Sequence, residues 1–126
     1  MENNTAPKKR ILIVDDDPDI AEAISLILSS KGYSSKTTCD GAEVAKLAKE
    51  YKPDLILLDL LLAGYDGRVI CKELKGDKST KEIPVVMISA HPSAESTVAK
   101  AGADGFIPKP FSIDSLMSNV EKHIRL

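Results

Sequence analysis

The 126-residue sequence contains no tryptophan, only two cysteines, and no apolar run long enough to span a membrane. Its N-terminus, MENNTAPKKR, lacks the apolar core of a secretory signal peptide. A strong net charge is also missing, because 17 basic and 19 acidic side chains leave only -2, which argues against a general polyanion-binding surface. No long linker rich in Ser, Gly or Pro divides the chain. We therefore expect one compact domain that neither crosses a membrane nor binds nucleic acid directly.

The two cysteines, Cys39 and Cys71, do not have the spacing of a metal site. Cys71 falls on the apolar face of an expected helix, so we predict that it lies in or near the core. Both are interpreted as reduced thiols, which favours a cytoplasmic location.

Short apolar or β-branched runs alternate with patterns typical of amphipathic helices. The runs are ILIV (11–14), SSKTT (34–38), DLILLD (54–59), PVVMIS (84–89) and GFIP (105–108). Three of them are almost entirely apolar, which is typical of strands buried on both faces of a parallel sheet. Five such units predict an α/β domain with one open parallel sheet and helices on both faces, because an eight-fold barrel needs about twice this length.

Five helices are expected between and after these strands, and Asp17 and Ser112 are plausible N-caps. The fourth helix, at about 92–101, has an apolar stripe of only three small side chains, so we expect it to be the least firmly docked element. The stripes of the other four are Ile20, Ala23, Ile24, Ile27, Leu28; Val44, Leu47, Ala48, Tyr51; Val69, Ile70, Leu74; and Ile113, Leu116, Met117, Val120, Ile124.

Polar side chains gather where the expected strands end. Asp15–Asp17 follow the first strand, Asp59 ends the third, Ser89 ends the fourth, and Lys109 follows the fifth. Because ligands of open α/β sheets bind beyond the carboxyl ends of the strands, these groups are expected at one edge. Asp17 stands before a proline at a helix start and is interpreted as a cap.

Asp59 is the most unusual of these residues, because it interrupts the apolar stretch Leu55–Leu62 and a carboxylate there is costly to desolvate. Neighbouring carboxylates raise one another's pKa values, and a divalent cation relieves this repulsion. An all-oxygen set of ligands suits Mg²⁺ or Mn²⁺ better than zinc. A carboxylate nucleophile beside a metal and Lys109 is suited to phosphoryl transfer.

Four segments, in this order and spacing, closely resemble the receiver domains of two-component response regulators: ILIVDDDPDI (11–20), PDLILLDLLLAGYDG (53–67), PVVMISA (84–90) and GADGFIPKPF (102–111). The resemblance extends from about Lys9 to Arg125. It implies a flavodoxin-like (βα)5 fold with strand order 2-1-3-4-5. It also implies a flexible tail at residues 1–8 and a receiver domain at 9–126.

The resemblance implies a phospho-accepting role for Asp59. Asp16 would be a direct Mg²⁺ ligand, Asp15 would help to position the metal, partly through water, and the backbone carbonyl of Leu61 would complete the protein ligands. Mn²⁺ could substitute for Mg²⁺.

The resemblance also implies a switch beside this site. Ser89 takes the place of the switch hydroxyl, Lys109 that of the phosphate-contacting lysine, and Phe106 that of the switch aromatic. The small Ala90 leaves room beside the acceptor. The Lys109–Pro110 bond is expected to be cis.

The implied function is that of a signalling switch. A sensor histidine kinase or a histidine phosphotransfer protein would supply the phosphoryl group, and the face made by the fourth helix, fifth strand and fifth helix would change for a downstream protein target. A turnover enzyme is not implied. A monomer and a phosphorylation-dependent homodimer both fit, as do a free-standing receiver and the N-terminal part of a longer regulator.

Some positions depart from the family pattern or adjust it. Ala63 replaces a frequent proline. Leu61 and His91 occupy positions that tune the lifetime of the phosphorylated state in this family, and a bulky Leu61 favours a moderately long lifetime. His91 is expected to be a solvent-facing loop residue, and His123 an exposed helix residue without a chemical role.

Three other functions fit the fold less well. A flavin-binding module needs a phosphate-binding first loop, which Asp15–Asp17 oppose. A phosphatase of the haloacid dehalogenase type has a second Asp two residues after its nucleophile, where this chain has Leu61. A degenerate receiver that only docks would be expected to lose an acidic, acceptor or lysine position, and none is lost.

Overall fold

The computed structural model describes residues 8–91 and 94–125. The predicted tail at residues 1–8 therefore lies almost wholly outside the described residues, as do the first positions, 92–93, of the predicted fourth helix. Among the described residues, none of the helices has both the length and the apolar character needed to cross a membrane.

Strands and helices alternate along the chain. The elements are β1 (Arg10–Val14), α1 (Pro18–Ser30), β2 (Ser34–Thr38), the 3₁₀ turn η1 (Gly41–Glu43), α2 (Val44–Tyr51), β3 (Leu55–Asp59), β4 (Leu61–Leu62), β5 (Tyr65–Asp66), α3 (Gly67–Gly76), β6 (Val85–Ser89), α4 (Ala94–Lys100), β7 (Gly105–Pro108) and α5 (Ile113–His123).

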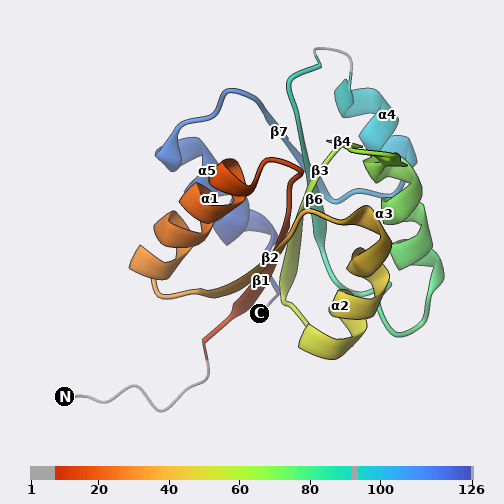
Figure 1. Ribbon diagram of the computed structural model, residues 1–126, viewed down its shortest axis with the longest axis horizontal. Helices are drawn as coiled ribbons and strands as arrows, with labels where there is room; N and C mark the ends of the chain where they lie inside the picture. The colour runs from red at the N-terminus through yellow and green to blue at the C-terminus, as the bar shows by residue number, and fades with distance from the viewer. Residues whose placement is uncertain (1–7, 92–93, 126) are drawn as a thin grey trace.

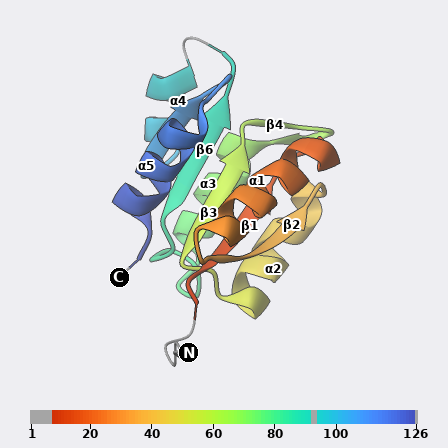
Figure 2. The same cartoon turned by 90° about the vertical axis from the view of Figure 1, so that its left-hand side faces the viewer.

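The five longer strands form one parallel sheet in the order β2-β1-β3-β6-β7. This confirms the predicted order 2-1-3-4-5, because β6 and β7 are the predicted fourth and fifth strands. Helices α1 and α5 cover one face of the sheet, and α2, α3 and α4 cover the other (Figure 1). The view turned by 90° shows α1 and α5 in front of the sheet, with α4 behind it (Figure 2).

Alternation along the strands divides the core into two layers. Ile11 and Ile13 of β1 pack with α1 and α5, whereas Leu12 and Val14 pack with α2, α3 and α4. Successive strand side chains point to opposite faces of a sheet, which explains the division. Both layers are apolar, and among the described residues every buried polar side chain except Thr80 lies at or next to the carboxyl end of a strand.

Polar caps set the starts of three helices. Asp17 Oδ1 accepts the N–H groups of Asp19 and Ile20 at the start of α1. Ser112 Oγ accepts the N–H of Ser115 at the start of α5. Both predicted caps are confirmed, and Asp66 acts in the same way at α3.

Four expectations about the helices were wrong. Ala23, which was placed in the apolar stripe of α1, is exposed. Val69 is 54% exposed, because it lies outside the face of α3 that packs on the sheet. Ile113, the first residue of α5, is also 54% exposed. His123 is half-buried rather than exposed, since its ring lies against Gly105 of β7. The buried side chains of α3 are those of Ile70, Cys71 and Leu74.

The short helix α4 buries only small side chains. Ala94 and Val98 are its buried residues, and Ala101 follows its end. The small apolar area predicted for this helix is thus confirmed, whereas its weak docking stays a prediction.

Candidate functional site

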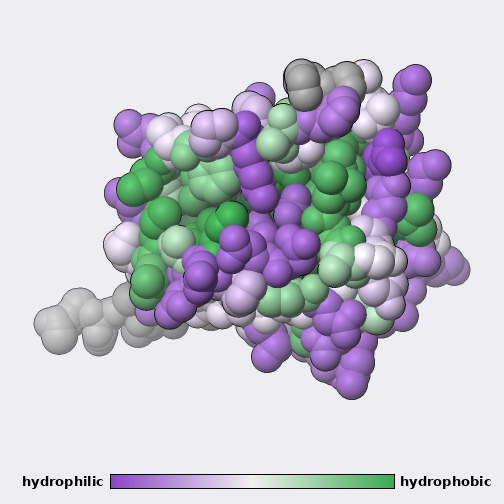
Figure 3. Space-filling view, turned by 45° about the horizontal axis from the view of Figure 1, so that its top comes forward, coloured by the Kyte–Doolittle hydropathy of each residue, from purple (hydrophilic) through white to green (hydrophobic). Residues whose placement is uncertain are grey.

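The predicted site lies at the carboxyl ends of the strands. Figure 3 shows this face, with hydrophilic side chains in its middle and hydrophobic areas on either side. One of the bordering apolar depressions is lined by Ile20, Ala90, Pro110 and Phe111 together with Lys109.

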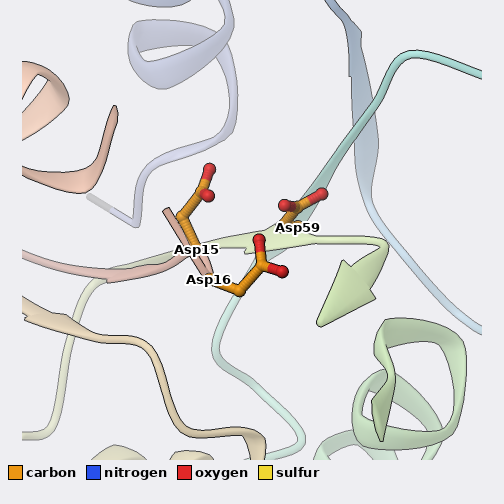
Figure 4. A group of neighbouring side chains, drawn as sticks. All are labelled: Asp15, Asp16 and Asp59. Atoms are coloured by element: carbon orange, nitrogen blue, oxygen red, sulfur yellow. The ribbon is translucent and has the colours of Figure 1, made fainter. Parts of the chain in front are cut away.

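Three carboxyl groups meet at this edge. One oxygen from each of Asp15, Asp16 and Asp59 lies within 4.8 Å of the others. Figure 4 shows two of them on the segment that follows β1 and the third at the end of β3. Asp15 and Asp59 are buried and Asp16 is exposed. Alternation from Ile13 and Leu57 places the two buried carboxylates on the same face of neighbouring strands.

Lys109 makes the two buried carboxylates tolerable. Its Nζ lies 3.5 Å from Asp15 Oδ2 and 3.4 Å from Asp59 Oδ2. The backbone N–H of Lys109 donates to the carbonyl of Ser89, which fixes this residue beside the end of β6. The Lys109–Pro110 peptide bond is cis.

The carboxyl group of Asp59 is harder to ionise than an ordinary aspartate. Burial raises its pKa, Lys109 lowers it, and the nearby charge of Asp15 raises it again. The nearby backbone N–H of Leu61 also lowers the pKa, but the net shift is upward. The lysine therefore offsets only part of the cost of desolvation and of carboxylate repulsion.

The donor atoms fit a hard divalent cation. The cluster consists of carboxylate oxygens without His or Cys, which suits Mg²⁺ or Mn²⁺. A cation there would also relieve the repulsion between Asp15 and Asp59. Asp15 Oδ1 already accepts the N–H of Asp17 at 2.9 Å, and this contact holds the carboxylate in place.

A depression of about 440 Å³ opens beside Asp59. The hydroxyl of Ser89 accepts the N–H of His91 at 3.0 Å, and His91 itself is exposed. Leu61 is 66% exposed at the rim. The site thus has a carboxylate, a hydroxyl and an ammonium group around one space; its lining residues are Asp59, Leu61, Ser89, Ala90, His91 and Lys109.

Two residues predicted near the switch lie apart from this depression. Phe106 of β7 is partly buried on the face of the sheet opposite to that of Asp15 and Asp59. There it packs with the core layer under α2, α3 and α4. Pro110 lines the neighbouring apolar depression instead.

Two features of the site were missed by sequence reasoning. One is the small antiparallel ribbon of β4 and β5 directly after Asp59. The Ala63-Gly64 pair was the available signal, since Gly64 has a φ of +76°, a conformation that favours glycine. The other is the contact of Lys109 with Asp15 as well as Asp59, which depends on the closeness of three strand ends.

Comparison with known proteins agrees with this arrangement. Residues 11–121 match the family described as Response regulator receiver domain. The chain is 37% identical over 118 residues to the DNA-binding dual master transcriptional regulator RpaA of Synechocystis, covering 92% of this chain and 49% of that protein. The chain therefore spans about half the length of the curated relatives it matches.

Solved structures share the fold. The BeF3-activated N-terminal receiver domain of RstA from Klebsiella pneumoniae has a TM-score of 0.86 and 27% identity, with 94% of this chain and 100% of that chain covered. The receiver domain of the sensor histidine kinase PA1611 from Pseudomonas aeruginosa has a TM-score of 0.84 and 24% identity, with 92% and 97% covered. That structure holds a magnesium ion in its active site cleft.

The family match covers residues 11–121, which include every strand of the parallel sheet from its second residue onward and all three clustered carboxylates. This chain belongs to the response regulator receiver domain family.

Proposed function

We propose that the chain is a signalling switch that accepts a phosphoryl group on Asp59. The observation that carries the proposal is the position of Lys109, whose Nζ lies 3.4 Å from Asp59 Oδ2 while two further carboxylates adjoin the same oxygen cluster. Catalysis of phosphoryl transfer is mostly positioning and neutralisation of charge, and this arrangement supplies both.

The donor is the phosphohistidine of a sensor histidine kinase or of a histidine phosphotransfer protein. A carboxylate oxygen of Asp59 bonds to phosphorus as the phosphorus–nitrogen bond breaks, and the imidazole nitrogen keeps the electron pair and takes up a proton. Lys109 neutralises charge on the transferred oxygens. The step modifies the chain's own side chain, so no turnover of a separate substrate is assigned to it.

The cation is assigned to Asp15, Asp16, Asp59 and the carbonyl of Leu61. When bound, Mg²⁺ neutralises phosphoryl charge in such sites, and Mn²⁺ has the same preference for oxygen ligands. Without it, Asp15 and Asp16 leave the site with excess negative charge that Lys109 alone must balance.

The switch couples the phosphoryl group to α4. Ser89 ends β6. On the neighbouring strand β7, Phe106 is paired with Met87 of β6 and lies on the face of the sheet that α4 covers. When Ser89 and Lys109 hold the phosphoryl oxygens, the loop after β6 moves inward and Phe106 turns into the space it leaves. Two packings of α4 then differ in population, because only one of them allows these contacts.

Partners read the face made by α4, β7 and α5. The chain acts there as a monomer or as a phosphorylation-dependent homodimer, with a downstream protein as its target. The DNA binding in the name of RpaA belongs to a protein about twice as long, and the balanced charge of this chain supports no direct contact with nucleic acid. The two free cysteines support a cytoplasmic location.

The direct test is labelling by a small phosphodonor, acetyl phosphate, with Mg²⁺ present. The wild-type chain is expected to take up acid-stable, base-labile label, and Asp59→Asn to take up none at the same site. Asp114→Asn, an exposed carboxyl in the first turn of α5, is the matched control and should label normally. Undiminished label in Asp59→Asn would contradict the proposal.

The switch has a separate test. Ser89→Ala is expected to be phosphorylated at Asp59 but to show a smaller change in the amide spectra of α4. If those spectra change as fully as in the wild type, Ser89 is not part of the switch.

A further inference from the structure

The segment after Asp59 is a short ribbon with two distinct sides. Leu62 of β4 is paired with Tyr65 of β5, and Leu61 with Asp66. Directly opposed residues of antiparallel strands have their side chains on the same side. Leu62 and Tyr65 therefore share one side of the ribbon, and Leu61 lies on the other.

Tyr65 connects the ribbon to a segment that is distant in sequence. A Cβ atom placed on Gly41 would lie 2.7 Å from Cγ of Tyr65 and 2.8 Å from its Cβ, so the side chain rests on the bare glycine backbone. Gly41 begins η1, which is held in place by the Asp40 cap on the N–H of Ala42. Because Tyr65 is 45% exposed, its burial alone contributes little, and the contact chiefly fixes where the ribbon lies.

Leu61 connects the same ribbon to the acceptor. Leu61 lines the same depression as Asp59, together with Ser89 and Lys109. An apolar side chain at the rim of this depression covers part of the path by which water reaches Asp59. The position of Leu61 depends on the position of the ribbon. The ribbon in turn is held in place by Tyr65 and by the buried Leu62.

We propose that Tyr65 is a positioning residue for the acceptor site. By resting on Gly41, it holds Leu61 over Asp59 and so slows hydrolysis of the phosphorylated state. This inference rests on the proposed function. In the hydrolysis, a water oxygen bonds to phosphorus, the bond to the Asp59 oxygen breaks with its electron pair on the carboxylate, and the protons of water leave with inorganic phosphate.

The test follows loss of label after the donor is removed. Tyr65→Ala is expected to lose label faster by about threefold to tenfold. This change in rate is smaller than the roughly 100-fold effect of displacing a reacting group itself, because Tyr65 acts only through Leu61. Tyr65→Phe keeps the ring and should retain the wild-type rate. Leu26→Ala, an exposed apolar change on α1, is the matched control and should also behave as wild type.

Two further variants separate positioning from a general loss of structure. Gly41→Ala displaces the ring from the other side of the contact and should accelerate hydrolysis as Tyr65→Ala does. Leu61→Ala should accelerate it directly. If Tyr65 acts through Leu61, the double variant Leu61→Ala/Tyr65→Ala loses label no faster than Leu61→Ala alone.

The outcomes distinguish this inference from the function on which it rests. If the wild-type chain takes up no label, the proposed function fails. If the wild type is labelled but Tyr65→Ala and Gly41→Ala both lose label at the wild-type rate, the role of Tyr65 is wrong. Additive acceleration in the double variant would also overturn it, because Tyr65 would then act independently of Leu61.

Discussion

At the residue scale, Asp59 shows how a site can weaken the fold that holds it. The carboxyl group is buried at the end of β3, beside a second buried carboxylate, and the single ammonium group of Lys109 serves both. Burial therefore raises the pKa of Asp59 despite the lysine. The ionised site is less stable than a neutral one until a cation or a phosphoryl contact balances it.

This imbalance predicts that Asp59→Asn stabilises the chain at pH 7 without divalent cations, on the order of 1 kcal/mol. Because the folded pKa of Asp59 lies above the unfolded one, the unfolded chain loses this proton first. The folded chain therefore loses stability as the pH rises from the unfolded pKa of Asp59 towards its raised folded pKa. Above the folded pKa, the full cost of ionising the buried carboxyl group applies. The advantage of Asn should vanish below about pH 3, where both states are protonated.

Urea unfolding in EDTA at pH 7 and at pH 3 measures the difference between the two chains. An equal difference at both pH values would show that ionisation of Asp59 is not its cause. Asp114→Asn controls for the loss of one acidic side chain elsewhere.

Gly105 illustrates a packing constraint that the sequence hides. A Cβ atom there would lie 2.5 Å from Nε2 of His123, which packs against β7 from α5. We expect Gly105→Ala to destabilise the chain by about 1 to 3 kcal/mol, the usual range for overpacking. Removing the ring with His123→Ala in the same background should recover part of the loss.

Gly76→Ala is the matched control for this prediction, because no atom lies within 4 Å of a Cβ at that position. Gly76 is the last residue of α3, so Gly76→Ala should not reduce the stability of the chain. In a helix interior, alanine is favoured over glycine by about 0.5 to 1 kcal/mol. Chemical denaturation compares the variants. Equal stability of Gly105→Ala and the wild type would show that His123 yields without cost.

At the element scale, α3 and α4 are attached to the sheet in different ways. The last turn of α3 is tied by Lys75, whose Nζ donates to Asp104 at 2.8 Å and to the carbonyl of Ile83 at 2.9 Å. Asp104 in turn accepts the N–H of Val85 at the start of β6. For α4, the buried contacts come only from small side chains. A helix held in this way can change its packing at low cost.

This contrast predicts faster amide hydrogen exchange in Ala94–Lys100 than in α3 and α5, by about tenfold or more. The reason is that opening α4 exposes little apolar surface, whereas opening the other helices exposes large side chains such as Leu74 and Leu116. Exchange followed by mass spectrometry at neutral pH measures it. Equal protection of the three helices would contradict weak docking of α4.

At the scale of the whole molecule, the parallel sheet gathers residues from distant segments at one edge. Asp59 ends β3, Asp15 follows the adjacent β1, and Lys109 follows β7, which lies two strands away on the other side of β3. Their closeness depends on the complete sheet, so unfolding disperses the site. Any ligand of the site is therefore also a ligand of the folded state.

Mg²⁺ is accordingly expected to stabilise the wild-type chain by about 2.7 kcal/mol when its concentration is 100 times the dissociation constant. Asp59→Asn should lose most of this gain, since one oxygen ligand and one charge are removed. Asp114→Asn should retain it. Thermal unfolding with and without Mg²⁺, at equal ionic strength, measures the effect, and an equal gain in all three chains would indicate binding elsewhere.

Much of the molecule could be predicted from local pattern. The apolar runs predicted the five strands of the sheet, and Asp17 and Ser112 predicted two helix starts, because side-chain alternation and capping act between near neighbours. The β4–β5 ribbon escaped prediction, since two-residue strands carry almost no periodic signal. The exposure of Val69 was missed because its stripe was drawn from too few residues.

The sequence by itself determined which groups end the strands and so reach the carboxyl edge of a parallel sheet, because where a strand ends along the chain is a local property. Only the tertiary structure decided the contacts among them. The approach of Lys109 to both Asp15 and Asp59, the ring of Tyr65 on Gly41 and that of His123 on Gly105 all join segments far apart in the chain. Such distances depend on how helices and strands pack, which periodicity does not specify.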